Sequence, residues 1–283
     1  MSLISLFLIL FILILIGYFL KKRANGPLNP LKKDFTGKLI IITGCSDGIG
    51  LVTAKDLLNS NATVIFACRN KTKTEEIINS FPEKMRKNSI FVQLNLSSFK
   101  SIKNFADEIK SKYKKIDILI NNAGVSPFNN IYKTEDGYLN AFQVNYLGNV
   151  LLTLLLMEHF NEKESKIINV SSQAHKWSKL TYGDSKYLND YGLKFNNSEF
   201  KIRRQLYPDS KLLLNYFTQY LGSLAEEKYP YLKVVCLHPG RIFTNIFTSQ
   251  KNIVFKILFN VIFRSIWYFS TKDVIHGAQT TFK

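Results

Sequence analysis

Two stretches of the sequence place a tyrosine four residues before a lysine, and both read Tyr-x-Asp-Ser-Lys. One pair is Tyr182 with Lys186, and the other is Tyr207 with Lys211. Residues four apart share one face of a helix, so in a helix each lysine would lie beside its tyrosine. A nearby ammonium group favours the phenolate and lowers a tyrosine pKa that is otherwise near ~10. Either pair therefore predicts a site that donates or accepts a proton.

The residues that follow each pair distinguish the two. Apolar side chains recur at helical spacing over residues 212–224, which predicts a long helix with a broad apolar face. Pro208 would fit the first turn of that helix. The other pair is followed by a glycine and paired asparagines without a sustained period, which predicts a loop. We therefore expect Tyr207 to do the proton transfer and Tyr182 to lie in a loop.

The chemistry needs a scaffold, and the stretch 37–60 predicts its beginning. A β-branched apolar run is followed by a turn with Gly44, Gly48 and Gly50 and then by an amphipathic stretch, the order of strand, turn and helix. Glycines at such a turn allow close backbone approach, and the helix N-terminus favours a pyrophosphate. A glycine trio alone is a weak signal, because a plain strand–helix turn can contain one.

The end of the next strand, at 63–67, predicts which dinucleotide would bind. In dinucleotide sites an acid at this place binds the ribose 2′-hydroxyl, whereas an arginine accommodates a 2′-phosphate. The residues here include Arg69 and no acid. They favour NADP(H) over NAD(H), although Asp47 beside the glycine turn argues mildly the other way.

The composition suits one folded α/β domain. The chain has 283 residues, of which 46% are hydrophobic and 21% charged, enough to bury a core. The net charge is +17, but the lysines are scattered without the basic-aromatic block of a nucleic-acid module, so no nucleic-acid partner is expected. Cys45, Cys68 and Cys236 are far apart without a C-x-x-C pair. They argue against a disulfide framework or a metal site and suit a reducing compartment.

The N-terminal stretch 1–22 is expected to be a transmembrane anchor. Residues 2–20 carry no charge, and such a helix would span the ~30 Å hydrocarbon core. The basic residues that follow favour a cytosolic location of the rest. A cleaved signal peptide would need positive charge before a shorter apolar run, and the sequence shows neither. Residues 23–36 would form a linker, and 37–283 the catalytic domain.

Five motifs occur in order: TGCSDGIG (43–50), NNAG (121–124), VNYLG (144–148), IINVSS (167–172) and HPGRIFT (238–244). Together they resemble the short-chain dehydrogenase/reductase superfamily. ACRN, SSQAH and HPGRIFT are similar to its membrane-associated retinol-dehydrogenase-like branch, and the long serine–tyrosine gap to the WW-domain-containing oxidoreductase. The resemblance implies an α/β fold, a Rossmann-like doubly wound parallel sheet with helices on both faces, here preceded by the N-terminal helix.

The resemblance also implies roles for four residues. Tyr207 would be the general acid/base, and Lys211 would tune it and hold the nicotinamide ribose. Strand alternation turns only one of Ser171 and Ser172 toward the cleft. The family pattern favours Ser172, which would hydrogen-bond the substrate oxygen. Asn145 would hold a proton-relay water. The cofactor contacts would come from Gly44, Ser46, Gly48, Ile49, Gly50, Arg69, Asn95, Leu96, Asn122, Ala123, Gly124, Tyr207, Lys211, Pro239, Gly240 and Thr244.

Residue 95, an insertion and the number of strands depart from the family pattern, and the segment 252–269 has two interpretations. Asn95 stands where an aspartate usually contacts the adenine, so we expect altered affinity rather than loss. The interval from Tyr207 to the His-Pro-Gly turn is close to that of the family, which makes 177–204 an insertion near the substrate mouth. The segment 252–269 is either an amphipathic membrane contact or a substrate lid. Six strands are expected, at 39–43, 63–67, 90–94, 116–120, 166–171 and 233–237, without the family's usual seventh.

These observations predict a membrane-anchored NADP(H)-dependent oxidoreductase. Its substrate would be a hydrophobic alcohol or carbonyl compound of the retinoid, sterol or fatty-aldehyde class. We expect the endoplasmic reticulum membrane, crossed once, with the catalytic domain facing the cytosol; a lipid droplet is the alternative. A homodimer is one option for its assembly. The rival hypothesis is a catalytically inactive member of the fold that binds a cofactor or a membrane.

Overall fold

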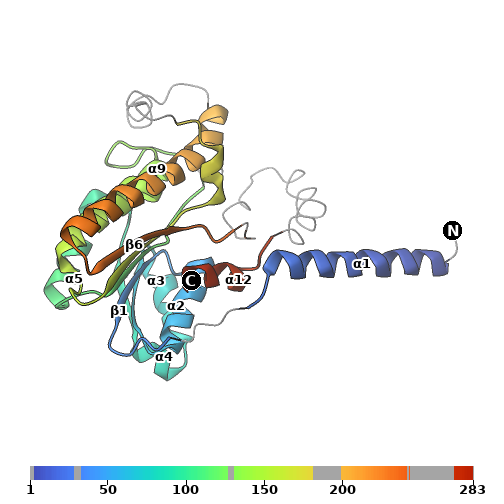
Figure 1. Cartoon of the computed structure of the whole chain (residues 1–283), viewed down its shortest axis with the longest axis horizontal. Coiled ribbons are helices and arrows are strands. Elements are labelled where there is room, and N and C mark those ends of the chain that lie inside the picture. Colours follow the sequence, from blue (N-terminus) through green and yellow to red (C-terminus); the bar gives the residue numbers. More distant parts are fainter. Residues whose placement is uncertain are drawn as a thin grey trace.

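A six-stranded parallel sheet forms the centre of the fold, with strands in the order β3-β2-β1-β4-β5-β6 (Figure 1). In such sheets ligands bind beyond the carboxyl ends of the strands, where the order reverses between β1 and β4. The computed structural model describes residues 3–28, 33–126, 131–180, 199–240, 242 and 271–282. The strands are β1 (Leu39–Thr43), β2 (Thr63–Cys68), β3 (Ser89–Gln93), β4 (Ile118–Asn121), β5 (Ser165–Val170) and β6 (Leu232–Leu237).

The central strands are buried on both faces, as their continuous apolar runs predict. Side chains alternate along a strand, so Ile40 and Ile42 of β1 enter one apolar core and Ile41 enters the other. All three are fully buried. The six-stranded parallel sheet expected from the sequence is confirmed, with strand ends that agree within two residues.

Helices cover both faces of the sheet (Figure 1). One face carries α2 (Gly48–Asn59), α3 (Lys71–Asn79) and α4 (Glu83–Lys87), and the other carries α5 (Phe99–Lys112), α7 (Gly148–Leu156) and α9 (Glu199–Lys228). The shorter helices are α6 (Asn140–Phe142), η1 (Gln143–Leu147), η2 (Met157–His159), η3 (Gln173–Trp177), α12 (Val274–Ala278) and η6 (Gln279–Phe282).

Helix α9 begins earlier than the sequence pattern predicts. It starts at Glu199, so Pro208 lies inside the helix instead of in its first turn, and the predicted insertion 177–204 ends in helix. Proline has no amide hydrogen, so the carbonyl four residues before it lacks its helical partner. The later turns bury Leu214 and Leu221 against the sheet. Before the proline, Leu206 is also fully buried, in a cluster with Leu139 and Phe142, so apolar packing holds the helix on both sides of Pro208.

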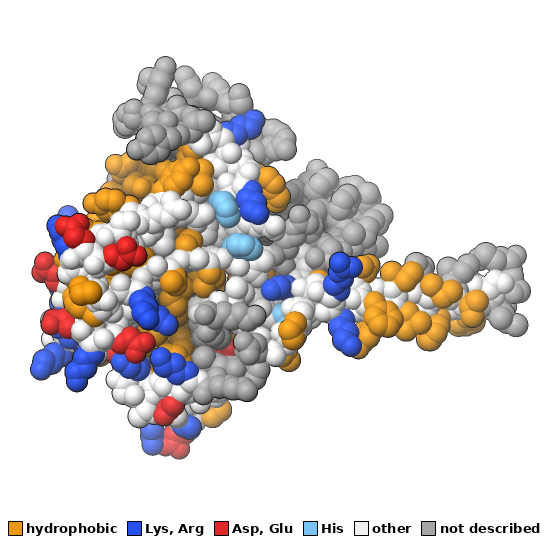
Figure 2. All heavy atoms as spheres, in the orientation of Figure 1, with side chains coloured by type: hydrophobic (Ala, Val, Ile, Leu, Met, Phe, Trp, Pro, Cys, Tyr) orange, Lys and Arg blue, Asp and Glu red, His pale blue; other side chains and the backbone are white. Residues whose placement is uncertain are grey.

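Helix α1 (Leu3–Asn25) projects from the body as a single rod (Figure 1). The helix includes residues 23–25, the first part of the stretch 23–36 that was predicted to be a linker. Its exposed side chains are mainly apolar, as Figure 2 shows along the rod, and basic side chains follow at its base. Among the residues that the structure describes, no helix meets the length and hydropathy needed to cross a membrane.

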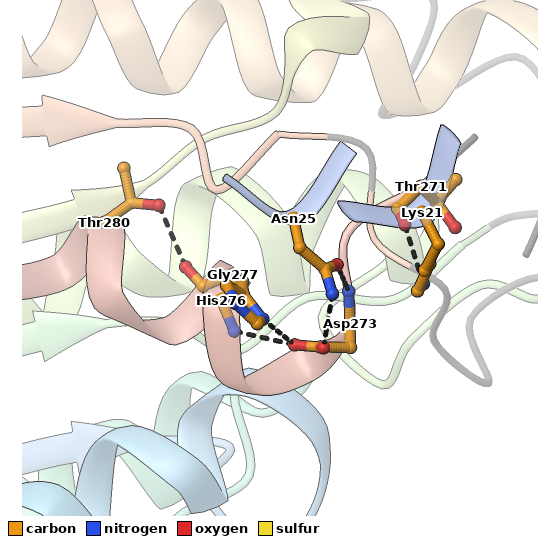
Figure 3. Close-up of polar contacts among 7 residues, drawn as sticks. All are labelled: Lys21, Asn25, Thr271, Asp273, His276, Gly277 and Thr280. Atoms are coloured by element: carbon orange, nitrogen blue, oxygen red, sulfur yellow. Dashed lines mark hydrogen bonds and ion pairs between the residues drawn. The ribbon is translucent and has the colours of Figure 1, made fainter. Parts of the chain in front are cut away.

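The base of α1 is tied to the C-terminal segment 271–282 (Figure 3). Lys21 Nζ donates to the Thr271 carbonyl at 2.8 Å. The Asn25 amide exchanges two hydrogen bonds with Asp273, one to its carboxylate and one from its backbone N–H, both of 2.9 Å. Asp273 also caps α12 by accepting from the His276 N–H at 2.8 Å, and α12 packs on α2. The polar contacts therefore link α1 to the helix of the glycine turn.

Candidate active site

The four catalytic candidates come from three elements that meet at the carboxyl edge of the sheet. Tyr207 and Lys211 lie one turn apart on α9. Ser172 follows β5 and is the N-cap of η3. Asn145 lies in η1, a π-helix, and such helices often mark functional sites. Helix α9 contacts both η1 and η3, so the structure brings all four side chains into one region.

Lys211 is buried, and its ammonium donates a 2.8 Å hydrogen bond to the carbonyl of Val170 at the end of β5. Its Nζ lies 5.8 Å from the centroid of the Tyr207 ring. Burial lowers the pKa of Lys211 to about 8, because the charged form loses its water. A Cβ at Gly124 would lie 3.4 Å from both Lys211 Nζ and Asn145 Oδ1. Because glycine has no Cβ, the space beside these two side chains stays free.

Burial raises the pKa of Tyr207 above its ordinary value, and a hydrogen bond with Ser172 acts in the opposite direction. Lys211 is not among the causes of this shift, so the expectation that it lowers the tyrosine pKa stays a prediction. The phenol is therefore protonated at neutral pH. In that state it can donate a proton to a substrate oxygen.

The two neighbouring serines face different partners. Ser171 is buried and donates to the backbone carbonyl of Lys211 at 3.2 Å. Ser172 is partly exposed, and its Oγ accepts from the Ala174 N–H at 3.2 Å. Its hydroxyl also lies within hydrogen-bonding reach of Tyr207. The structure therefore turns Ser172, and not Ser171, toward the tyrosine.

Asn145 is fully buried and holds the loop after β4 in place. Its Oδ1 accepts from the Val125 N–H at 2.8 Å, and its Nδ2 donates to the Val125 carbonyl at 3.0 Å. The same Nδ2 lies 3.1 Å from Ser210 Oγ on α9. The side chain thus joins the β4 loop to the tyrosine helix, while the relay water expected at Asn145 stays a prediction.

The glycine turn between β1 and α2 has the backbone that a dinucleotide needs. Gly44 and Gly48 have φ angles of 66° and 56°, which residues with a side chain rarely adopt. A Cβ at Gly44 would lie 2.8 Å from Ala123 Cα, whereas one at Gly48 would meet no heavy atom within 4 Å. The Asn122 amide donates to the Thr43 carbonyl at 2.9 Å and supports the turn. The residues here fit a ligand phosphate at the start of α2.

The end of β2 places cations beside this turn. Arg69, which was predicted to contact a 2′-phosphate, is exposed there. Lys73 on α3 was not predicted, yet its Nζ lies 3.1 Å from the carboxylate of Asp47, which caps α2. Only the pairing of β1 with β2 brings Lys73 to the turn, so no local sequence signal marks it.

Comparisons with known proteins agree with this geometry. Residues 38–187 match the family described as short chain dehydrogenase. The chain is 31% identical to mouse retinol dehydrogenase 14, over 92% of this chain and 78% of the relative. It is 33% identical to human retinol dehydrogenase 11, over 98% and 81%. The protein belongs to the short-chain dehydrogenase/reductase superfamily.

Solved structures show the same fold. A crystal structure of an uncharacterised protein from Mycobacterium paratuberculosis aligns with a TM-score of 0.65 and 25% identity, over 88% of this chain and 76% of the other. An NADPH-bound carbonyl reductase from chicken fatty liver aligns with a TM-score of 0.60 and 22% identity, over 88% and 86%. The resemblance seen in the motifs is thereby confirmed, and this short-chain dehydrogenase/reductase is retinol-dehydrogenase-like.

The other predicted cofactor residues of this dehydrogenase/reductase that the structure describes follow strand ends or open α2. Asn95 stays close to the backbone, since its Oδ1 accepts from the Ser97 N–H at 3.1 Å. Gly240 has a φ of 88° and follows β6. Thr244, Tyr182 and the segment 252–269 lie outside the described residues. The remaining positions follow the strand ends or open α2: Ser46, Ile49 and Gly50 after β1, Leu96 after β3, Ala123 after β4 and Pro239 after β6.

A hollow of about 560 Å³ lies between α9 and the edge strand β6. Ser171, His175, Cys236 and His238 are among its lining residues. Burial lowers the pKa of His238, and neighbouring positive charges act in the same direction. In the part of the chain that the structure describes, none of the four catalytic candidates lines this hollow, so it is separate from the proton-transfer site.

Proposed function

We propose that this short-chain dehydrogenase/reductase transfers a hydride between NADP(H) and a hydrophobic alcohol or carbonyl compound of the retinoid, sterol or fatty-aldehyde class. The observation that carries the proposal is the meeting of Tyr207, Lys211, Ser172 and Asn145 beside the glycine turn. The retinol dehydrogenases among its relatives support a lipophilic substrate.

Each of the four residues would have one role in the reaction. When bound at the glycine turn, the nicotinamide cofactor supplies or accepts the hydride. Ser172 holds the substrate oxygen, and Tyr207 gives its proton to that oxygen in reduction or takes one in oxidation. Lys211, fixed by the Val170 carbonyl, places positive charge near the phenolate that proton donation leaves. The protein's part is therefore to orient the substrate oxygen and move one proton.

The choice of NADP(H) rests on charge at the end of β2. Arg69 and Lys73 supply two cations there, and the second is held by Asp47 at the turn. A 2′-phosphate would gain charge-assisted hydrogen bonds from them. NAD(H) lacks this phosphate and would gain nothing from either cation, so we propose a preference for NADP(H).

We also propose attachment to the endoplasmic reticulum membrane through α1, with the catalytic domain on the cytosolic side. The exposed apolar side chains of α1 support insertion into lipid, and the basic residues at its base favour the cytosolic side. A lipid droplet surface would suit the same helix. The segment 252–269 as a second membrane contact and a homodimer as the assembly are further parts of the proposal.

The proposal is tested by measuring turnover of a panel of lipophilic aldehydes by the purified protein, with NADPH or NADH as the cofactor. We expect turnover with NADPH, and a fall of about 10²- to 10⁴-fold in Tyr207→Phe, which keeps the ring but loses the proton. Tyr182→Phe is the matched control and should keep its activity. Turnover that survives Tyr207→Phe but is lost in Tyr182→Phe would show that the wrong tyrosine has been assigned.

An inactive member of the superfamily is the alternative function. Asn95 favours it, because an aspartate is usual there, and the side chain is engaged with its own turn. This alternative predicts NADPH binding without turnover of any aldehyde by the unaltered protein. A measurable rate that depends on Tyr207 would exclude it.

A further inference from the structure

Two buried thiols lie beside the glycine turn and take no part in the proton-transfer site. Cys45 is in the turn after β1, and Cys68 is the last residue of β2. The parallel pairing of these strands places Thr43 opposite Ala67, so the residues just beyond are neighbours. The two Sγ atoms are 3.7 Å apart. The fold has thus joined two cysteines that the sequence keeps apart.

The spacing suits a reversible bond. A disulfide needs its sulfur atoms ~2.05 Å apart and its Cα atoms ~4.4–6.8 Å apart. The observation here is the 3.7 Å between the two Sγ atoms, which places both side chains within reach of one S–S bond. The sulfurs need to approach by only ~1.7 Å, a shift within reach of side-chain rotation.

The two thiols have different acidities. A hydrogen bond from Cys45 lowers the pKa of Cys68 to about 7, and hydrogen bonds from Thr74 and Ser46 act in the same direction. Burial raises the pKa of Cys45 well above its usual range. Cys68 is therefore the more acidic thiol of the pair and the one that forms a thiolate near neutral pH, and the thiolate is the nucleophile in sulfur chemistry.

We propose that Cys45 and Cys68 form a redox-sensitive dithiol, which hydrogen peroxide converts to a disulfide that weakens dinucleotide binding at the adjacent turn. The effect on the dinucleotide rests on the proposed function, whereas the disulfide itself does not. Both sulfurs are buried, with exposed fractions of 0% and 2%, so the oxidant must be about as small as water. Peroxide meets that requirement, and bulky oxidised thiols do not.

The chemistry balances in two steps. The Cys68 thiolate attacks one peroxide oxygen, the O–O bond breaks, and hydroxide leaves to give a sulfenic acid on Cys68. The Cys45 thiol then loses its proton and attacks the Cys68 sulfur, which forms the S–S bond and releases the second oxygen as water. In sum, two thiols lose two electrons and two protons, and the peroxide becomes two waters. A dithiol reductant is larger than peroxide, so it reverses the reaction more slowly, during local openings of the fold.

The disulfide would strain the site because the turn cannot shift freely. Gly44 packs so closely on Ala123 that even a Cβ would lie 2.8 Å from its Cα. The backbone shift that the S–S bond requires would therefore displace Ser46, which follows Cys45, and Arg69, which follows Cys68. Both are residues assigned to the cofactor, one to the phosphate turn and one to the 2′-phosphate.

The test uses the full chain with Cys236→Ser, which removes the one other cysteine. Trypsin cleaves after Lys38, Lys55 and Arg69, so Cys45 and Cys68 leave in separate peptides, 39–55 and 56–69. After peroxide treatment of the folded protein we expect these peptides joined, both thiols lost to titration, and both restored by dithiothreitol. Cys45→Ala and Cys68→Ala should each abolish the joined peptide.

The effect of the disulfide on cofactor binding is measured separately, by titration with NADPH. We expect the oxidised protein to bind NADPH at least about tenfold more weakly than the reduced protein, with recovery after dithiothreitol. A joined peptide that forms in urea but never in the folded protein would overturn the dithiol. A joined peptide with unchanged NADPH affinity would overturn the effect on binding. A reduced protein that binds no NADPH would count against the proposed function, and the mass result would still decide the dithiol.

Discussion

At the scale of single residues, burial sets the protonation of Tyr207 and Lys211 more than their mutual attraction does. Burial raises the pKa of the tyrosine and lowers that of the lysine, because it disfavours the charged form of each. The protein without a ligand thus presents a neutral phenol beside an ammonium that loses its proton just above neutral pH. That state is ready to donate a proton to a carbonyl oxygen.

Replacing Lys211 with methionine should change how stability depends on pH. The pKa of Lys211 falls from 10.5 to about 8 on folding, so between these values the unfolded chain binds more protons. The free energy of unfolding therefore rises with pH across this window, by ~3 kcal/mol from this group alone. Lys211→Met should lack that rise. Urea unfolding from about pH 7.5 to about pH 10 measures it, and parallel curves for the two proteins would contradict the lowered pKa.

Gly44→Ala should destabilise the fold, because the new Cβ would lie 2.8 Å from Ala123 Cα at a φ of 66°. We expect a loss of about 2–4 kcal/mol in the free energy of unfolding. Gly222 is the matched control: it lies in α9, where an added Cβ would meet no heavy atom within 4 Å, and Gly222→Ala should gain ~0.5–1 kcal/mol. Chemical denaturation compares the two, and effects of the same sign would disprove the packing argument.

At the scale of elements, hydrogen bonds fasten the base of α1 to the body. Lys21 and Asn25 meet Thr271 and Asp273, and Asp273 in turn caps α12 (Figure 3). A long helix is thus held through a small set of polar side chains. The attachment should therefore be sensitive to one side chain.

Asn25→Asp should release this attachment. The change keeps the shape but replaces the amide donor with a carboxylate that faces Asp273, so a hydrogen bond becomes a repulsion. We expect backbone amides of 271–278 to exchange about tenfold faster, while those of β1 and β4 stay protected. Lys22→Ala, an exposed change on the same helix, is the control. Equal exchange in both variants would mean that the hydrogen bonds do not hold α1.

At the scale of the whole molecule, an apolar rod and a strongly basic body occur in one chain. The exposed side chains of α1 are mainly apolar, and the net charge is +17. Apolar insertion does not depend on salt, whereas attraction to anionic lipid is screened beyond ~10 Å at 0.1 M ionic strength. The two contributions can therefore be separated by lipid charge and by salt.

The full chain should bind phosphatidylcholine vesicles, and should bind vesicles that also contain phosphatidylserine more tightly. Raising the salt should remove only the additional binding. Replacing Lys22 and Arg23 with glutamine should lower that additional affinity roughly thirtyfold, since each of the two charges near the surface contributes ~1 kcal/mol. Co-sedimentation measures both. Failure to bind either vesicle would refute the proposed membrane attachment.

Local patterns were enough to predict the sheet and to nominate the site. The apolar runs at 39–43 and 63–67 identify buried strands, because a parallel strand is covered on both faces. The helical period after Lys211 distinguishes Tyr207 from Tyr182, whose place lies outside the described residues. Strand alternation orients only one of the two side chains, Ser171 or Ser172, toward the cleft. Each of these inferences needs only the geometry of a single element.

The tertiary structure decided what depends on segments that are distant in sequence. The pKa of Tyr207 rises because other elements bury it, and no spacing to Lys211 reveals that burial. Before Pro208, α9 packs through Leu206 against Leu139 and Phe142, which are distant in sequence. The same holds for the pairing of Lys73 with Asp47 and for the 3.7 Å approach of Cys45 and Cys68. Sequence alone determined which groups exist and on which face of an element they lie; the fold decided which of them meet, because protonation and reactivity depend on neighbours in space.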